Sequence, residues 1–346
     1  MKRSFMFICA AALLLTGCGA SADEASAQLF AMDTVMQLDA YGHQVKQAVS
    51  DAEETIQALE ARLSRTREDS LVSVLNQNGA AQDLSAAEQA LLSEALTFRD
   101  ATGGAFDITI APVMDAWGFT GDSYRVPAQD ELDALLENVN SDEIRLSGSS
   151  VTLGARQAID LGGIAKGYTS DCVEAVFREN KIESGKISLG GNVFVLGGKP
   201  DGADWRVGIR DPQDENALAG VLTLRDAYAI TSGGYERYFT ENGNTYHHII
   251  DPSTGYPADS GLLSVTVVAE ANGPDFSGPG NGTMCDAFST ALFVMGEERA
   301  LEFWRTGGYD FDLVLVTADG RVIITDGLSD RFEAVKDSGY TYETVS

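Results

Sequence analysis

Residues 160–168 read Asp-Leu-Gly-Gly-Ile-Ala-Lys-Gly-Tyr, after an apolar stretch that ends at Ile159. Glycines lack a Cβ atom, so this backbone can approach a ligand closely, and the N-terminus of a following helix attracts anions. Lys166 adds a positive charge. The pattern predicts an anion-binding turn between a strand and a helix, with a purely structural turn as the alternative. It is not a Walker A loop, because Lys166 precedes the closing glycine, and it is not a GxGxxG fingerprint.

A second distinctive stretch, residues 246–257, reads YHHIIDPSTGYP and contains two of the three histidines, His247 and His248. Neighbours on a strand point to opposite faces, so only one of the two can face a given cleft. An imidazole beside such a turn is a candidate general base, and a structural histidine is the alternative. A Ser232-His248-Asp251 hydrolase triad is less well supported, because the chain has no G-x-S-x-G motif.

Asp286 and Thr290 lie four residues apart at the start of a predicted helix, so their side chains share one face. A carboxylate and a hydroxyl are hard oxygen ligands of the kind that Mg²⁺ prefers. The pair is therefore a candidate magnesium site. An ordinary helix N-cap aspartate is the alternative explanation of Asp286.

The N-terminus has the features of a bacterial lipoprotein signal: Lys2 and Arg3, an apolar run over 5–15, and Leu-Thr-Gly-Cys at 15–18. A transmembrane anchor is the alternative, but the run is shorter than the ~20 residues needed to span a bilayer. We expect a signal peptide over 1–17, lipid on Cys18, a flexible tether over 18–27 and a folded domain over 28–346. The protein would then be extracytoplasmic and membrane-anchored.

Hydrophobic periodicity predicts the secondary structure. Helices are expected over 45–63, from the Ser85–Glu88 capping box to about Asp100, over 129–138, after Gly167, and from Asp286 to about Phe303. Strands are expected over 106–110, as two strands within 144–161, and over 185–195, 205–210, 221–224, 246–250, 263–269, 312–317 and 321–325. Strands occur in groups without strict alternation with helices, which favours an α+β fold of mixed sheets and flanking helices.

The formal net charge is −28, and 44% of the residues are apolar. So negative a chain repels nucleic acid and anionic membrane surfaces, which argues against both as partners. A polyanionic ligand would need a metal ion, a lysine or a cluster of backbone N–H groups to bind. Beyond the signal and Cys18 only Cys172 and Cys285 remain, so no disulfide framework is expected.

Several motifs occur in one order along the chain. They are Met32-Asp33-Thr34, TGGAFD (102–107), DLGGIAKGY (160–168), LGGN (189–192), TSGGYERYF (231–239), YHHIIDPSTGYP and CDAFSTALFVMG (285–296). This series resembles that of the ApbE family of FAD:protein FMN transferases over roughly residues 28–330. The resemblance implies a T-fold-related scaffold. It also implies cleavage of FAD, transfer of FMN to a threonine or serine of an acceptor protein through a phosphoester, and release of AMP.

The resemblance also implies roles for particular residues. FAD would be bound by Met32, Ala105, Phe106, Asp107, Asp160, Lys166 and Ile250. Mg²⁺ would be bound by the carbonyl of Gly163 and the side chains of Asp286 and Thr290. His248 would take the proton of the acceptor hydroxyl, with Asp286 as the other candidate base. The expected partner is an acceptor protein of a membrane-associated or extracytoplasmic flavin redox system.

Three features depart from the family pattern. Asp33 replaces the usual glycine, the segment Ser64-Arg65-Thr66 lacks an aromatic, so that Arg65 would have to stack on the ligand instead, and the loop 272–284 is long. Two alternatives therefore stay open. One is an FAD pyrophosphatase that uses water as the acceptor, and the other is a non-catalytic flavin-binding lipoprotein.

Overall fold

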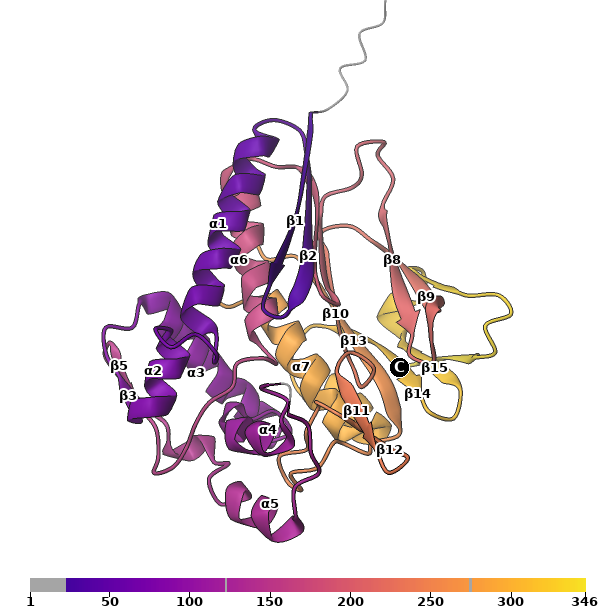
Figure 1. The fold of residues 1–346 in the computed structure, drawn as a ribbon. Coiled ribbons are helices and arrows are strands. Elements are labelled where there is room, and N and C mark those ends of the chain that lie inside the picture. The colour runs from indigo at the N-terminus through magenta and orange to yellow at the C-terminus, as the bar shows by residue number, and fades with distance from the viewer. Residues whose placement is uncertain (1–22, 122, 274–275) are drawn as a thin grey trace, which may run out of the picture.

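A nine-stranded mixed sheet runs through the protein in the order β1-β2-β6-β7-β10-β13-β14-β15-β17 (Figure 1). We describe it from a computed structural model that covers residues 23–121, 123–273 and 276–346. Neighbouring strands are antiparallel except for the last pair, β15 and β17. The strands are β1 (Glu24–Ala31), β2 (Thr34–Tyr41), β6 (Ser184–Leu189), β7 (Asn192–Leu196), β10 (Ala227–Gly233), β13 (Leu262–Glu270), β14 (Asp312–Thr317), β15 (Arg321–Thr325) and β17 (Thr341–Val345).

One face of this sheet is covered by α1 (Val45–Leu63), α6 (Ala165–Glu179) and α7 (Asn281–Met295), which is followed by α8 (Glu297–Thr306) (Figure 1). The largest apolar core lies between these helices and the sheet. Phe177 of α6 and Phe288 and Phe293 of α7 are almost wholly buried in it. Burial of such side chains stabilises the fold by about 1.5–3 kcal/mol each.

The opposite face is covered by a three-stranded sheet made of β8 (Trp205–Asp211), β9 (Asp214–Leu224) and β16 (Phe332–Ala334). Strand β8 alternates buried and exposed residues as a strand covered on one face should, whereas residues 264–269 of the central strand β13 are all buried, so both faces of the main sheet are dry near its centre. The site therefore has to lie at an end of the sheet and not on its faces.

The remaining elements gather beside α1 and α7. They are α2 (Leu71–Asn78), β3 (Ala80–Ala81), α3 (Ala86–Ala101), η1 (Ile108–Ile110), α4 (Ala111–Trp117), α5 (Gln129–Leu136), η2 (Ser141–Glu143), β4 (Arg145–Ser147), β5 (Ser150–Thr152), the hairpin β11 (Tyr238–Glu241) and β12 (Asn244–His247), and η3 (Asp326–Leu328) near the C-terminal end. A small core around Trp117, Phe119 and Ile250 joins α4 and α5 to the β11–β12 hairpin.

Most sequence predictions for the elements are confirmed. The α+β class, the helix over 45–63, the capping box of Ser85 and Glu88, and the helix 129–138, which ends slightly early, are all present. The free state of Cys172 and Cys285 agrees with the expected lack of a disulfide framework. Within the described residues, no helix is long and apolar enough to cross a membrane.

Several predictions about the elements need correction. The expected strand 185–195 is two strands, β6 and β7, joined by a turn at Gly190 and Gly191, and the one expected over 246–250 ends at His247. Residues 106–110 are not a strand, because the Asp107 side chain accepts the N–H of Thr109 and starts a helical turn. The tether prediction is wrong for 24–27, which pair with β2. The two strands within 144–161 stop at Thr152, so an irregular segment precedes α6. The helix expected from Asp286 begins at Asn281 and is interrupted at Gly296, whose φ of 78° marks the break between α7 and α8. The predicted signal peptide and Cys18 lie outside the described residues.

Helices α6 and α7 approach each other most closely at Gly167. A Cβ atom there would lie 2.2 Å from the carbonyl oxygen of Gly282 and 2.6 Å from Cβ of Asp286. Both neighbours are rigidly placed, so any side chain would push the helices apart. Gly167, the glycine that follows Lys166, is therefore required for the packing of the two helices.

We expect Gly167→Ala to lower the free energy of unfolding by about 1–3 kcal/mol, the usual cost of overpacking a core. Urea denaturation followed by circular dichroism measures the change. Gly121→Ala is the matched control, because a Cβ there meets nothing within 4 Å. A Gly167→Ala protein as stable as the control would contradict the close approach.

Candidate active site

A cavity of about 430 Å³ opens at the end of the main sheet, between the β1–β2 turn, the N-terminus of α6, α7 and the segment after β12. Every residue assigned above to FAD, Mg²⁺ or catalysis lines it: Met32, Ala105, Phe106, Asp107, Asp160, Gly163, Lys166, His248, Ile250, Asp286 and Thr290. These residues come from five segments that are far apart in the sequence. The predicted site is thus assembled in one place.

The three candidate magnesium donors converge at one wall. A Cβ atom on Gly163 would lie 3.3 Å from Oγ1 of Thr290, so the glycine backbone and the threonine hydroxyl are neighbours. Asp286 is buried, and its Oδ2 accepts the N–H of Gly167 at 2.8 Å. Its Oδ1 has no hydrogen-bond donor among the described residues. A backbone carbonyl, a hydroxyl and a free carboxylate oxygen form a hard-oxygen donor set that fits Mg²⁺.

Clusters of imidazole or thiolate ligands are not found among the described residues. Over residues 23–121, 123–273 and 276–346, no three His, Cys, Asp or Glu side chains gather as a metal cluster. Zinc and copper sites rely on several imidazole or thiolate ligands. The wall at Asp286 therefore suits a hydrated hard cation that completes its coordination with ligand oxygens.

His248 is the histidine that faces the cavity. Its Nδ1 lies 3.1 Å from the carbonyl oxygen of Arg237. A carbonyl can only accept, so Nδ1 carries the hydrogen and Nε2 keeps its lone pair. Burial and the nearby Arg237 charge lower the pKa of His248 to about 3. The ring is therefore neutral at physiological pH and able to accept a proton.

His247 has a structural role. Its Nε2 lies 3.2 Å from the carbonyl oxygen of Ala258, and its Nδ1 accepts the N–H of Ile249 at 3.3 Å. Both ring nitrogens are engaged in the turn, and His247 does not line the cavity. As expected, only one of the two histidines faces the cavity, although strand β12 ends at His247 and His248 lies in the bend that follows it.

No hydrolase triad forms around Ser232. Its hydroxyl pairs with the hydroxyls of Ser289 at 2.7 Å and Thr290 at 3.2 Å. Asp251 accepts the N–H and O–H of Ser253 and so caps its own turn. Ser232 instead lies beside the candidate metal donor Thr290.

Asp160 is tied into the opposite wall. Its Oδ1 accepts the N–H of Gly162 at 2.6 Å, and its Oδ2 forms an ion pair with Nη1 of Arg65 at 2.9 Å. Asn76 holds the preceding residue, Ile159, by donating to its carbonyl oxygen and accepting its N–H. Asp160 is therefore fixed before any ligand arrives.

Arg65 lies one residue before Thr66, which stands where the family pattern has an aromatic. Besides Asp160, it donates to the Asp115 carboxylate at 2.9 Å and to the Thr120 hydroxyl at 2.8 Å. The side chain is 12% exposed and lines the cavity. A fixed cation therefore lies in the wall next to the position that lacks the aromatic.

Asp107 and Met32, two further predicted ligand residues, also line the cavity, and each bonds to neighbouring groups of the fold. Asp107 uses its carboxylate within the fold, where Oδ1 accepts the hydroxyls of Thr109 and Ser141 at 2.6 Å each. The Met32 sulfur accepts the Thr169 hydroxyl at 3.6 Å, which ties the β1–β2 turn to α6. The Asp107 carboxylate is thus used to support the fold, and its backbone remains available to a ligand in the cavity.

The cavity is strongly acidic. Six carboxyl side chains line it, namely Asp33, Glu60, Asp107, Asp160, Glu236 and Asp286, against three cations, Arg65, Lys166 and Arg237. Lys166 forms no ion pair with another described residue and is free to meet a ligand. Burial raises the pKa of Glu236, with Arg210 and Lys166 opposing the shift. An anionic ligand here would need a cation in addition to Lys166.

Sequence reasoning did not assign Glu60, Glu236 or Arg237 to the site. Glu236 and Arg237 lie within the motif TSGGYERYF, so the motif was the available signal. Glu60 gave none, because it sits on the predicted packing helix α1 and reaches the cavity by accepting the N–H of Met32 at 3.2 Å.

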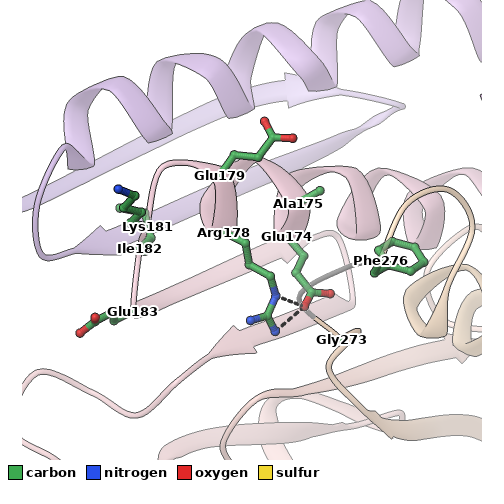
Figure 2. A pocket seen from close by; sticks show the side chains of 9 residues that line it. All are labelled: Glu174, Ala175, Arg178, Glu179, Lys181, Ile182, Glu183, Gly273 and Phe276. Atoms are coloured by element: carbon green, nitrogen blue, oxygen red, sulfur yellow. Dashed lines mark hydrogen bonds and ion pairs between the residues drawn. The ribbon is translucent and has the colours of Figure 1, made fainter.

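A second cavity, of about 380 Å³, lies at the far end of α6 (Figure 2). It is lined by Glu174, Arg178 and Lys181 among others, and by none of the predicted site residues. Glu174 and Arg178 pair with each other there. The chemistry predicted from the sequence therefore belongs to the first cavity alone.

Comparison with known proteins agrees with this geometry. The ApbE family model matches residues 32–312. The FAD:protein FMN transferase of Treponema pallidum is 33% identical over 83% of this chain and 82% of its own length. That of Klebsiella pneumoniae is 36% identical over 68% of this chain and 70% of its own. The crystal structure of the ApbE protein from Thermotoga maritima superposes with a TM-score of 0.80, at 30% identity, over 88% of this chain and 98% of that one.

The fold class predicted from the sequence is thereby confirmed, since the superposition covers 88% of this chain. The proteins matched by sequence carry the name of a transferase. On the family match, the identity and the shared fold together, this chain is a transferase and belongs to the ApbE family.

Proposed function

We propose that this protein is a Mg²⁺-dependent FAD:protein FMN transferase that joins FMN to a threonine or serine of an extracytoplasmic acceptor protein and releases AMP. The observation that supports this most strongly is the convergence of Gly163, Asp286 and Thr290 beside Lys166 and His248 in one cavity. Two of the relatives named as such transferases support the activity by their identity.

The charge of the cavity supports the metal requirement. The pyrophosphate of FAD would enter a space lined by six carboxyl groups and three cations. When bound, Mg²⁺ would neutralise the phosphate oxygens and stabilise the charge that develops on the departing AMP. Gly163, Asp286 and Thr290 would hold it, and Lys166 would contact the same phosphates.

His248 is suited to remove the proton of the acceptor hydroxyl. Its Nε2 lone pair is available because Nδ1 donates to the carbonyl of Arg237. In the proposed step the hydroxyl oxygen attacks the phosphorus of the FMN half, and the bond between that phosphorus and the bridging oxygen breaks. The proton passes to Nε2, and AMP leaves with the bridging oxygen. An incoming pyrophosphate would raise the low pKa of the ring and so strengthen it as a base.

We also propose that the protein is held at a bacterial membrane by lipid on Cys18. The support is the signal sequence, with its basic start, short apolar run and cysteine. Strand β1 begins at Glu24, so residues 19–23 would link the lipid to the folded domain.

A transfer assay tests the proposed function. Incubation with FAD, Mg²⁺ and an acceptor domain from a related flavin redox system should yield FMN covalently bound to that domain and an equal amount of AMP. Mass spectrometry and nucleotide chromatography measure both products. Free FMN with AMP and no modified acceptor would instead identify an FAD pyrophosphatase, and intact FAD after metal-independent binding would identify a flavin-binding protein.

We expect His248→Asn to lower the transfer rate about 100-fold or more at saturating FAD, the usual effect of removing a general base. FAD binding, followed by flavin fluorescence, should persist. His247→Asn is the matched control, because its ring serves the turn and does not line the cavity. It should lower stability and leave the rate per folded molecule nearly unchanged. A full rate in His248→Asn would assign the base elsewhere.

We expect Thr290→Val to raise the Mg²⁺ concentration for half-maximal transfer at least 10-fold, since it removes one donor without changing the side-chain shape appreciably. Ser289→Ala is the control, because Ser289 is buried next door and bonds to Ser232 and to the carbonyl of Asp286. A Mg²⁺ titration of the transfer rate gives both values. Equal titrations for the two variants would remove Thr290 from the metal site.

A further inference from the structure

Asp171 is a charged side chain that the proposed chemistry does not use. It lies on α6, one turn after Gly167, and is 0% exposed. Its two oxygens accept five hydrogen bonds. Oδ2 accepts the N–H of Gly280 at 2.8 Å and the N–H and O–H of Thr283, and Oδ1 accepts the N–H of Gly282 and Nδ2 of Asn272 at 2.8 Å each. All five groups donate, so the carboxylate is engaged as an acceptor only.

Three of these donors are the backbone N–H groups at the start of α7. The first N–H groups of a helix have no partner within the helix and are usually capped by a side chain of the residue at its N-terminus. Here that residue is Gly280, which has no side chain. Asp171 supplies the cap from the neighbouring helix, and its negative charge also matches the positive end of the α7 dipole.

This cap lies close to the candidate metal donors. Helix α7 carries Asp286 just after its first turn and Thr290 one turn further. The carbonyl oxygen of Gly282, on α7, packs against Gly167 of α6. The N–H of Gly167 in turn binds Asp286. Asp171 therefore fixes the rotation and height of α7 against the helix that carries Lys166. Donor positions must hold within about 0.5 Å for a metal site to keep its affinity.

We propose that Asp171 is the positioning residue of the metal site: by capping α7 from α6, it sets where Asp286 and Thr290 stand relative to Gly163. This inference rests on the proposed function for the identity of the donors. It predicts a loss of metal affinity that is larger than any loss of stability explains.

Glu174 provides a matched control. It lies on the same helix, three residues after Asp171, and is also 0% exposed. It pairs with Arg178 (Figure 2). It also bonds to the hydroxyl of Tyr228 and the amide of Asn272, and it makes no hydrogen bond to α7 among the described residues. Asp171→Asn and Glu174→Gln thus remove equally buried charges from one helix, but only the first touches the metal-bearing helix.

The experiment is a Mn²⁺ titration of the full chain in the presence of FAD, followed by electron paramagnetic resonance, with thermal unfolding measured in parallel. Asp171→Asn should raise the half-saturating Mn²⁺ concentration about 10-fold or more. Glu174→Gln should shift it less than about twofold at a comparable loss of melting temperature. The transfer rate of Asp171→Asn should recover at saturating metal. Equal shifts in the two variants, or none in Asp171→Asn, would overturn the proposal.

Two further variants keep the outcomes apart. Thr283→Val removes one of the five donors and should shift the titration two- to threefold in the same direction, so it serves if Asp171→Asn does not fold; an unshifted titration would then reject the proposal. Asp286→Asn tests the metal donors themselves. If it binds Mn²⁺ as wild type does, the proposed metal site and the role of Asp171 both fall. If Asp286→Asn weakens binding and Asp171→Asn does not, only the positioning role falls.

Discussion

The close contact between α6 and α7 at Gly167 is the constraint on which the site depends. One helix brings Lys166 and the glycine turn, and the other brings Asp286 and Thr290. Without a Cβ at Gly167, the backbones meet closely enough for its N–H to reach Oδ2 of Asp286 at 2.8 Å. A single hydrogen bond contributes only about 1 kcal/mol. Its value here is geometric, because it orients the carboxylate through Oδ2 and leaves Oδ1 without a donor among the described residues.

Charge is the second organising feature. The whole chain carries a formal charge of −28, and the cavity itself has twice as many carboxyl groups as cations. Some of these acids are already compensated: Asp160 by Arg65, and Asp107 by hydroxyl donors. Asp286 keeps a free oxygen and Lys166 keeps a free ammonium group. The unpaired groups thus lie where a metal-bound phosphate would be placed, while the paired acids maintain the walls.

Local sequence signals predicted the parts of this fold that depend on local physics. The α1 periodicity, the Ser85 capping box and the oxygen pair Asp286 and Thr290 all follow from contacts within one helix. The strand predicted over 106–110 failed because alternating apolar residues do not reveal that Asp107 caps a helical turn. The strand order of the main sheet could not be read, since β13 pairs with β10 and β14 through contacts set only by the folded chain.

The site shows the same division. Each motif could be recognised on its own, but the role of Asp171 could not, because its partners Gly280, Gly282 and Thr283 lie more than 100 residues away in the sequence. Gly280, the N-cap residue of α7, has no side chain and therefore gave no capping signal in the sequence. A helix that lacks its own cap and still begins cleanly must obtain one from elsewhere, and only the folded structure reveals the source.

Arg65 lies next to Thr66, where the aromatic of the family pattern is missing, and its guanidinium bonds to several polar groups around it. Asp115 lies in α4 and Thr120 just after it, whereas Asp160 begins the glycine turn, so the guanidinium joins α4 to that turn. Without Arg65, the carboxylate of Asp160 in the acidic cavity and the exposed carboxylate of Asp115 outside it would lose their guanidinium partner. The hydrogen bonds engage the edges of the planar guanidinium, so its faces are what it can present to a ring. Arginine and aromatic side chains both offer a flat surface for stacking. Arg65, next to the position that lacks the aromatic, could therefore offer a stacking surface in addition to the positive charge that pairs with Asp115 and Asp160.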